Sequence, residues 1–113
     1  MADAELPRRL PPLNSLKAFE AAARLGGVSQ AARELGVTPG AVSQQIRLLE
    51  SHAGAPLLRR EPGGLALTEL GERLQPVLRD AFDQLKRAAE VIYGPARRRS
   101  LAVSVPPSFA ARW

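Results

Sequence analysis

Small and polar residues gather where a helix is expected to begin, and their chemistry suits the edges of DNA bases. Ser43 and Gln44 offer a hydroxyl and an amide, and a glutamine can form two hydrogen bonds to adenine. Arg47 follows one helical turn later and suits a backbone phosphate. The other residues of this face are small or can cap the helix, so that it could enter a major groove: Thr38, Pro39, Gly40 and Ala41.

Three residues around this segment have the spacing of a helix-turn-helix. Ala32 is small enough for two helices to approach, Gly36 can adopt the left-handed conformation of a tight turn, and Val42 fills the wedge between the helices. Ile46 adds apolar packing one turn after Val42. The plainer alternative is a helical hairpin within a small bundle. The small polar face and the positive helix N-terminus favour DNA instead.

Two arginines and a serine outside that helix complete the candidate DNA contacts. Arg59 and Arg60 belong to a predicted hairpin, where a wing could reach a neighbouring groove or the phosphate backbone. Ser29 lies at the expected start of the preceding helix. Surface arginines often have no ligand, and Arg47 could instead pair with Glu50 or Ser51 of its own helix.

The sequence predicts two short helices ahead of this segment. Asn14 is a suitable N-cap for the first, whose apolar residues repeat at helical spacing until Gly26 and Gly27 end it. The second helix is expected to run from an N-cap at Ser29 to Leu35.

The third helix and the hairpin after it have clear signals. Thr38 can cap the helix, Pro39 occupies the first helical position, and Gly54 follows its end. Two short runs, 57–60 and 65–68, are then separated by proline and paired glycine, which is typical of a hairpin. The apolar stripe of the helix is Val42, Ile46 and Leu49.

A long helix is predicted from an N-cap at Thr68 to about Tyr93. Pro76 should kink it or open one hydrogen bond. Its apolar residues recur every three or four positions, which predicts a seam for dimerisation, although packing on its own domain is the alternative. The residues of this predicted seam are Leu70, Leu74, Val77, Ala81, Leu85, Ala88 and Ile92.

Length, charge and composition limit the function classes. The 113 residues leave room for one small domain and an appendage, and the formal net charge of +5 favours polyanionic partners. The chain has no cysteine, which suits a reducing compartment, and neither a signal-peptide segment nor a membrane-spanning apolar run. We therefore expect a cytoplasmic protein with no membrane contact.

Patterns typical of catalysis are missing from the sequence. His52 is the only histidine, with neither a cysteine nor a second histidine to accompany it. Gly63 and Gly64 belong to a turn rather than to a phosphate-binding loop. We expect no enzyme activity, no metal site and no cofactor.

Several stretches share the pattern of a known family: 13–23, 29–39, 41–50, 56–60 and 67–71, which together cover about residues 11–93. They resemble the LysR-type transcriptional regulators, and the segment 101–113 is most similar to the glycine-cleavage-activator subgroup. The resemblance implies a mainly α fold, in which a winged helix-turn-helix of three helices and a two-stranded wing precedes a long dimerising linker helix.

The resemblance also implies partners and roles. These are double-stranded DNA, a homodimer through the linker helix, higher oligomers in a full-length protein, and a small-molecule effector only where an effector domain is present. The arginine matching Arg60 contacts DNA in the family. The family positions that face the groove match Pro39, Gly40, Ala41, Ser43 and Gln44.

The expected organisation has four parts. They are a flexible arm over 1–12, a DNA-binding domain over 13–68, a linker helix over 69–93, and a hinge with the first strand of an otherwise absent effector domain over 94–113. Within the second part, the helix-turn-helix takes about 28–47 and the wing about 57–68. Two other interpretations remain: a protein-interaction module built on the linker helix, and a winged-helix DNA binder of another family.

Overall fold

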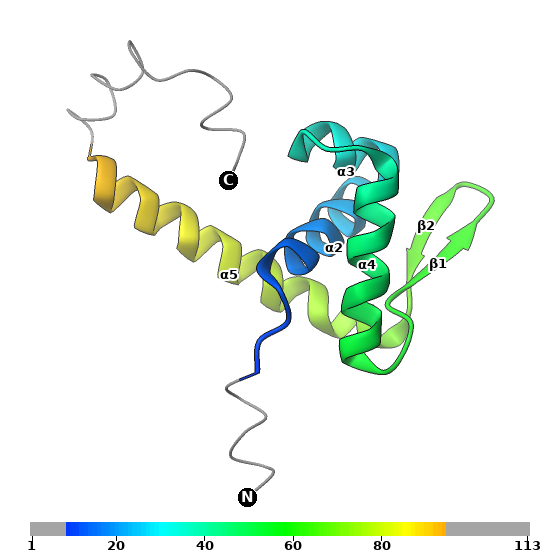
Figure 1. Cartoon of the computed structure of the whole chain (residues 1–113). Coiled ribbons are helices and arrows are strands. Elements are labelled where there is room, and N and C mark those ends of the chain that lie inside the picture. Colours follow the sequence, from blue (N-terminus) through cyan, green and yellow to red (C-terminus); the bar gives the residue numbers. More distant parts are fainter. Residues whose placement is uncertain (1–8, 95–113) are drawn as a thin grey trace, which may run out of the picture.

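The computed structural model describes residues 9–94, which form helices and one antiparallel hairpin. Figure 1 shows α2, α3 and α4 clustered together, with the hairpin projecting on one side and α5 leading away on the other. This is the winged helix-turn-helix with a long following helix that the sequence predicted. The elements are α2 (Leu13–Leu25), α3 (Val28–Leu35), α4 (Pro39–Ala53), β1 (Leu58–Glu61), β2 (Gly64–Leu67) and α5 (Glu69–Tyr93).

Helix α2 begins one residue before the predicted cap. Its N-cap is Pro12, so the expected N-cap at Asn14 is wrong. The Pro12 carbonyl accepts hydrogen bonds from the backbone N–H of Ser15 at 3.0 Å and of Leu16 at 3.2 Å, which starts the helical ladder. The buried Ser15 hydroxyl donates to the same carbonyl at 2.7 Å. Asn14 therefore lies inside the first turn.

Helix α3 also begins earlier than predicted. Its N-cap is Gly27, whose carbonyl accepts a hydrogen bond from Ala31 N–H at 3.2 Å, so the predicted cap Ser29 lies inside the helix. The end of α3 matches the prediction. Gly36 has a φ of 71° in the left-handed region and donates its N–H to the Ala32 carbonyl, as the tight turn of a helix-turn-helix requires.

Helix α4 confirms both of its predicted ends. The Thr38 hydroxyl accepts a hydrogen bond from Ala41 N–H at 3.1 Å, Pro39 is the first helical residue, and Gly54 is the C-cap. The helix is thereby fixed at the end that would meet DNA. The predicted apolar stripe is buried: Val42, Ile46 and Leu49.

The wing is a two-stranded antiparallel sheet, shifted by one residue from the predicted runs. Leu57 lies just before β1, and its side chain is fully buried in the core. The predicted four-residue turn shortens to Pro62 and Gly63, because the neighbouring residues pair across the strands. The register is Leu58 with Leu67, Arg59 with Ala66, Arg60 with Leu65, and Glu61 with Gly64.

Helix α5 begins where it was predicted to begin. The Thr68 hydroxyl accepts a hydrogen bond from Gly71 N–H at 3.1 Å, and the helix continues through Pro76 to Tyr93. Gly71 has no space for a side chain, since a Cβ there would lie 2.2 Å from the Leu57 carbonyl oxygen. Neither α5 nor any other helix within residues 9–94 is long and apolar enough to cross a membrane.

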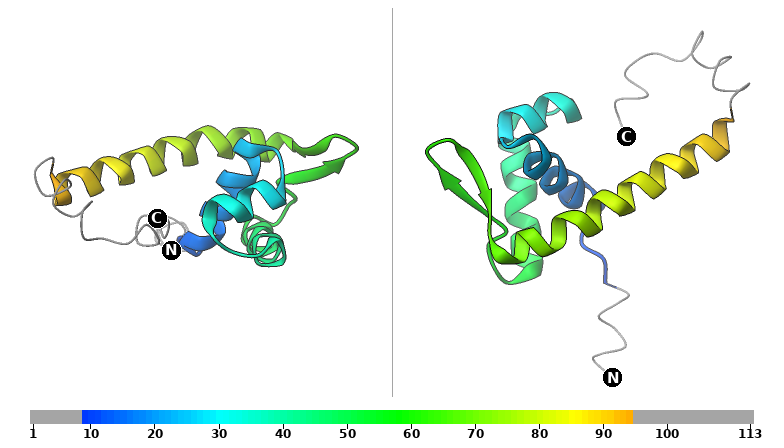
Figure 2. Two further views of the ribbon diagram at one scale, coloured as in Figure 1. Left: turned by 90° about the horizontal axis from the view of Figure 1, so that it is seen from above. Right: turned by 180° about the vertical axis from the view of Figure 1, so that it is seen from behind.

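Helix α2 lies at the centre of the domain. It contacts α3, α4, α5 and β2, and the view from above in Figure 2 shows it between α4 and α5. The predicted scaffold residues Ala32, Val42 and Ile46 are buried with it. The core consists of Ala18, Phe19, Ala21, Ala22, Ala31, Ala32, Val42, Ile46, Leu49, Leu57 and Leu78.

The apolar residues of α5 divide between two faces. Leu78, which the predicted seam omitted, is buried, and Phe82 packs against the core beside it. Leu70 and Leu74 from the predicted seam also pack there. The other seam residues except Leu85, which is half-buried, are exposed: Val77, Ala81, Ala88 and Ile92.

Two predicted segments lie mainly or wholly outside the described residues. Of the arm over 1–12, only residues 9–12 are described. Of the segment 94–113, only Gly94 is described, as the C-cap of α5. The hinge and the effector-domain strand therefore stay predictions.

Candidate nucleic-acid interface

The N-terminal part of α4 carries the candidate recognition face, which we define as Thr38, Pro39, Gly40, Ala41, Ser43, Gln44 and Arg47. Gln44 and Arg47 are exposed, as are Thr38, Pro39 and Gly40. Ala41 and Ser43 are half-buried. Because the residues ahead of Gln44 are short, the helix backbone itself could approach base edges closely. The fold thus keeps this face accessible along its whole length.

A hollow of about 240 Å³ lies between α4 and the wing. Arg47 from α4 and Arg60 from β1 border it, and neither has an ion pair or hydrogen bond within the described residues. Two unpaired guanidinium groups beside one hollow suit an anion such as a phosphate. The complete lining is Val28, Ser43, Ile46, Arg47, Glu50, Leu58, Arg60 and Leu65.

Glu50 fixes the wing relative to α4. Its Oε2 accepts hydrogen bonds from the backbone N–H of Leu57 at 2.8 Å and of Leu58 at 3.3 Å. The alternative in which Glu50 pairs with Arg47 is wrong, because this carboxylate binds the start of the wing. Arg47 is left available to a ligand.

The two wing arginines differ in their surroundings. Arg59 forms an exposed ion pair with Glu61 at 3.4 Å, a contact that contributes little in water. Arg60 is the neighbour that lines the hollow, and successive residues of a strand point to opposite faces. Arg60 is therefore the better placed of the two to act together with Arg47.

Helix α3 reaches the same hollow through its first turn. Val28 lines the hollow, and Ser29 beside it is exposed. No side chain caps the N-terminus of α3. The structure thus brings three predicted contact regions together: Ser29, the recognition face and Arg60.

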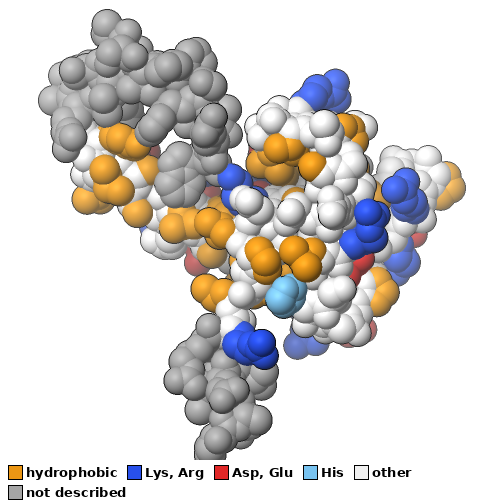
Figure 3. Space-filling view, viewed as in Figure 1, with side chains coloured by type: hydrophobic (Ala, Val, Ile, Leu, Met, Phe, Trp, Pro, Cys, Tyr) orange, Lys and Arg blue, Asp and Glu red, His pale blue; other side chains and the backbone are white. Residues whose placement is uncertain are grey.

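The surface above this junction is rich in positive charge. Figure 3 shows Lys and Arg side chains gathered on the right of the molecule, where α4 meets the hairpin. The chain as a whole carries a formal net charge of +5. Clustered positive charge of this kind attracts a polyanion and makes its binding depend on salt.

Arg24 links α2 to α3. Its Nε donates to Glu20 Oε2 at 2.9 Å in α2, and its Nη1 donates to Glu34 Oε1 at 3.1 Å in α3. Its Nη2 also contacts Glu34 Oε2. The hydrogen bonds from Arg24 hold the pKa of the Glu34 carboxyl below its ordinary value, and those to Glu34 and then Glu20 raise the pKa of Arg24.

The lowered pKa of Glu34 predicts a loss of stability in acid. A carboxylate with a lowered folded-state pKa stabilises the fold above its unfolded pKa, and this contribution disappears as the pH falls through the lowered value. Glu34→Gln should reduce the free energy of unfolding at neutral pH by about 1 kcal/mol at most, because the pair is exposed and screened. Urea titrations across a pH series should show the difference vanishing in acid.

The control for this experiment is the same substitution in an Arg24→Gln background. Without the guanidinium, Glu34→Gln should have a much smaller pH-dependent effect, because the main interactions that lower the pKa of Glu34 are gone and only the weaker attraction of Lys86 remains. An equal effect in both backgrounds would mean that Glu34 acts through something other than Arg24.

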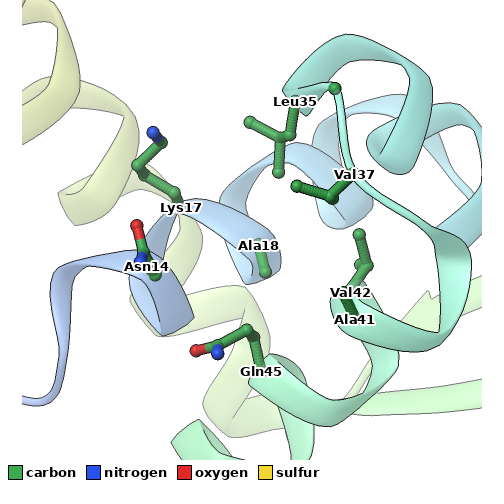
Figure 4. A pocket seen from close by; sticks show the side chains of 9 residues that line it. Asn14, Lys17, Ala18, Leu35, Val37, Ala41, Val42 and Gln45 are labelled. Carbon is green, nitrogen blue, oxygen red and sulfur yellow. The ribbon is translucent and has the colours of Figure 1, made fainter. Parts of the chain in front are cut away.

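A second hollow, of about 490 Å³, lies on the other flank of α4. Figure 4 shows the Gln45 side chain extending from α4 toward the first turn of α2, where Asn14 lies. Gln45 Oε1 is buried and has no hydrogen-bond partner within the described residues. Such an atom usually has a partner, so this flank can accept a hydrogen bond. The lining is Asn14, Lys17, Ala18, Leu35, Gly36, Val37, Ala41, Val42 and Gln45.

Sequence reasoning missed these polar residues beside the recognition face. Gln45 has the same side chain as Gln44, and only the rotation of α4 against α2 separates the exposed residue from the half-buried one. Glu50 was missed as the anchor of the wing for a similar reason, since its partners lie in the following loop. Within residues 9–94, no group of three His, Cys, Asp or Glu side chains could hold a metal ion.

The chain is also similar to known sequences. Residues 13–72 match the family described as "Bacterial regulatory helix-turn-helix protein, lysR family". The chain is 43% identical over 106 residues to the AhcY transcriptional activator HvrB of Rhodobacter capsulatus, covering 94% of this chain and 36% of HvrB. It is 44% identical over 108 residues to the transcriptional regulator TrpI of Pseudomonas aeruginosa, covering 96% and 37%.

A third relative fits the subgroup suggested by the sequence. The glycine cleavage system transcriptional activator of Escherichia coli is 43% identical over 108 residues, covering 96% of this chain and 35% of the activator. The chain thus spans about a third of the length of these curated relatives.

Solved structures share the fold. The DNA-binding domain of CbnR, solved in complex with DNA, has a TM-score of 0.63 and 29% identity, covering 76% of this chain and 99% of that domain. A structure of Corynebacterium glutamicum OxyR has a TM-score of 0.71 and 25% identity, covering 77% of this chain and 28% of OxyR.

Proposed function

The chain belongs to the lysR family of bacterial regulatory helix-turn-helix proteins, and from that premise we propose that it binds double-stranded DNA in a sequence-specific manner. The recognition face of α4 enters a major groove, and the wing contacts the flanking backbone. The observation that carries the proposal is the position of Arg47 and Arg60, unpaired and on either side of one hollow.

The contacts divide between base edges and phosphates. Gln44 and Ser43 read bases, because a glutamine side chain matches adenine and a serine can donate or accept. Arg47 and Arg60 hold phosphates, which sets the position of the helix without specifying sequence. The remaining predicted contacts, from Arg59, Ser29 and the helix cap at Thr38, lie around this centre and contribute to orientation.

Two copies act together through α5. Paired recognition helices need a two-fold axis to reach two half-sites, and α5 carries exposed aliphatic residues away from the face that packs on its own domain. The exposed fractions are 63% for Val77 and 61% for Ile92. The alternative of a dimerisation module is compatible with this proposal, because α5 can join the two copies while α4 binds DNA.

The whole protein regulates transcription in this proposal. Its relatives are named as transcriptional activators and regulators, and a DNA-binding role of α4 fits those names. A full-length protein would add an effector-binding domain after residue 94, where a small molecule would act, and would assemble beyond a dimer. No catalytic step is assigned to any residue.

Gln44→Ala tests the assignment of base reading. Loss of the amide should reduce affinity for the preferred sequence by about 1–3 kcal/mol and relax the preference at one position of each half-site. Affinity for unrelated DNA should change little, because the arginines remain. Binding of fluorescent duplexes at fixed salt measures both quantities.

Leu48→Ala is a control on the same helix. Leu48 lies outside the recognition face and is 39% exposed. It should leave both affinities close to those of the parent chain. If Gln44→Ala weakened binding to every sequence alike, Gln44 would be a positioning residue, and another side chain would read the bases.

A further inference from the structure

Helix α4 has a hollow on each of its two flanks. Ala41 lines the hollow of about 490 Å³, which we call the α2-side hollow, and Ser43 lines the hollow of about 240 Å³, the wing-side hollow. With about 100° between successive residues, these two residues point about 160° apart around the helix axis. Gln44 points outward between them and is exposed. The recognition face is therefore bordered by one hollow on each side.

The dimensions of DNA place one backbone strand against each flank of α4. The major groove is about 12 Å wide, and a helix with its side chains is about 10–12 Å across, so a helix that enters the groove fills it. The phosphates of one strand then border one flank, and the phosphates of the other strand border the opposite flank. Arg47 and Arg60 line the wing-side hollow and serve the first strand. The second strand meets the α2-side hollow.

The α2-side hollow joins a polar wall to an apolar wall. Figure 4 shows Asn14 and Lys17 of α2 and Gln45 of α4 on one side, and aliphatic side chains of the turn and of α4 on the other. One of these aliphatic residues, Val37, is 47% exposed. The apolar wall suits the carbon atoms of a deoxyribose, and ammonium and amide groups suit phosphate oxygens. The lining fits a phosphodiester together with its sugar.

The charge of the α2-side hollow favours an anion. Among the described residues that line it, Lys17 is the only ionisable one, and α2 has no acidic residue in its first turn. The wing-side hollow, by contrast, includes the Glu50 carboxylate, which accepts hydrogen bonds from the backbone of the wing. A phosphate in the α2-side hollow would therefore meet a positive charge with no carboxylate in the same lining.

Gln45 contributes a hydrogen-bond acceptor to this hollow. Its Oε1 is buried and has no partner within residues 9–94, and its side chain extends toward Asn14 (Figure 4). The amide of Asn14 carries two N–H groups, one of which can donate to Gln45 Oε1 and the other to a phosphate oxygen. Because buried acceptors usually have a partner, Gln45 is suited to orient Asn14.

We propose that the α2-side hollow is a second phosphate-binding site, which holds the DNA strand across the major groove from the strand at Arg47 and Arg60. Lys17 and Asn14 bind the phosphate, and Gln45 is a positioning residue that orients Asn14. The apolar wall packs against the adjoining sugar. The inference rests on the proposed DNA binding by α4 and identifies the contacts of its second strand.

The salt dependence of binding tests the role of Lys17. Lys17→Gln should lower the affinity for duplex DNA of any sequence by about tenfold, because one charge-assisted hydrogen bond to phosphate is lost. The plot of the logarithm of affinity against the logarithm of salt concentration should become shallower by about one unit. Lys17→Arg should keep the parent slope, because the charge remains. Titrations of a fluorescent random-sequence duplex at several salt concentrations measure both quantities.

Lys86→Gln is the matched control for this experiment. Lys86 lies on α5, outside the lining of both hollows, and its side chain is 77% exposed. The control removes the same charge from the same type of residue, so we expect only the small effect of a lower net charge. An equal loss of slope in Lys17→Gln and Lys86→Gln would overturn the second phosphate site.

Failure of the second site can be distinguished from failure of the proposed function. If the affinity of the parent chain for duplex DNA did not fall as salt rises, phosphate binding beside α4 would fail altogether. If Arg47→Ala/Arg60→Ala made the slope shallower by about two units while Lys17→Gln left it unchanged, only the second site would be wrong.

Gln45→Leu separates a positioning role from a structural one. The variant removes the unpartnered oxygen, so chemical denaturation should show no loss of stability. Affinity for DNA should still fall by about fivefold, with the parent salt slope, because a neutral contact is lost. In an Asn14→Ala background, Gln45→Leu should have little further effect on affinity. An undiminished effect in that background would overturn the positioning role.

Neutral phosphates locate the second strand directly. A methylphosphonate removes the charge of one phosphate, and it can be introduced in turn at each position of a duplex enriched by selection from a random pool. The parent chain should be sensitive at two groups of phosphates, on opposite strands of one major groove. Lys17→Gln should lose its sensitivity at one group, and Arg47→Ala/Arg60→Ala at the other. A Lys17→Gln chain that stays as sensitive as the parent at both groups would overturn the proposal.

Discussion

Removing both Arg47 and Arg60 should lower the affinity for DNA of any sequence by about 100-fold at constant salt. Each charge-assisted hydrogen bond to phosphate corresponds to about a tenfold change in affinity. The plot of the logarithm of affinity against the logarithm of salt concentration should become shallower by about two units. Titrations of Arg47→Ala/Arg60→Ala at several salt concentrations measure both effects.

Arg73→Ala/Arg79→Ala is the matched control for this experiment. It removes the same charge from exposed residues of α5, away from the hollow between α4 and the wing. We expect only the small effect of a lower net charge. If this control altered the slope as much as the first variant, general attraction would explain binding, and the hollow would not be the phosphate site.

Gly71→Ala should destabilise the domain, although alanine normally favours a helix over glycine. The added Cβ would lie 2.2 Å from the Leu57 carbonyl oxygen. That oxygen accepts a hydrogen bond from Thr68 N–H at 3.0 Å, so it cannot move away without weakening the start of α5. Overpacking of this kind costs about 1–3 kcal/mol, and chemical denaturation measures it.

Gly40→Ala is the natural control, because it places the same methyl group in the first turn of another helix. No atom lies within 4 Å of a Cβ at Gly40, so alanine should raise stability by up to about 1 kcal/mol. Equal effects of the two substitutions would show that helix propensity alone determines the change in stability. The added Cβ at Gly71 would then not clash with the Leu57 carbonyl.

The element order was predictable because the strongest signals were local. Thr38, Thr68 and Gly36 act within a few residues of their own position, so their roles could be inferred from spacing alone. The predicted N-caps Asn14 and Ser29 were wrong, because each helix begins earlier than its cap signal suggested. The carbonyl two residues before each of them, in Pro12 and Gly27, accepts the first hydrogen bond of the helix.

The candidate site was only partly predictable from the sequence, because its key contacts are tertiary. That Arg47 is unpaired depends on Glu50 binding the start of the wing, seven and eight residues away. The difference between Gln44 and Gln45 depends on how α4 rotates against α2. The spacing of Ala32, Gly36 and Val42 identified the recognition helix, but it could not indicate which polar side chains of different elements contact one another.

The two faces of α5 illustrate the same limit. A repeat of three and four residues fits several stripes of an amphipathic helix equally well. Leu78 and Phe82 pack in the core, so Gln84 and Val91 lie on the face of α5 that is exposed to solvent. The docking of a helix on its own domain therefore decides which of its stripes is available to a partner.

Selection of bound sequences from a random pool of double-stranded DNA, at stated salt, tests the central claim most directly. A dimer that reads bases through α4 should enrich two related half-sites with two-fold symmetry, spaced by one helical turn or a multiple of it. Selection with Gln44→Ala should alter one position in each half-site. A pool with no enriched sequence, or with enriched sequences that lack any paired half-sites, would contradict the account.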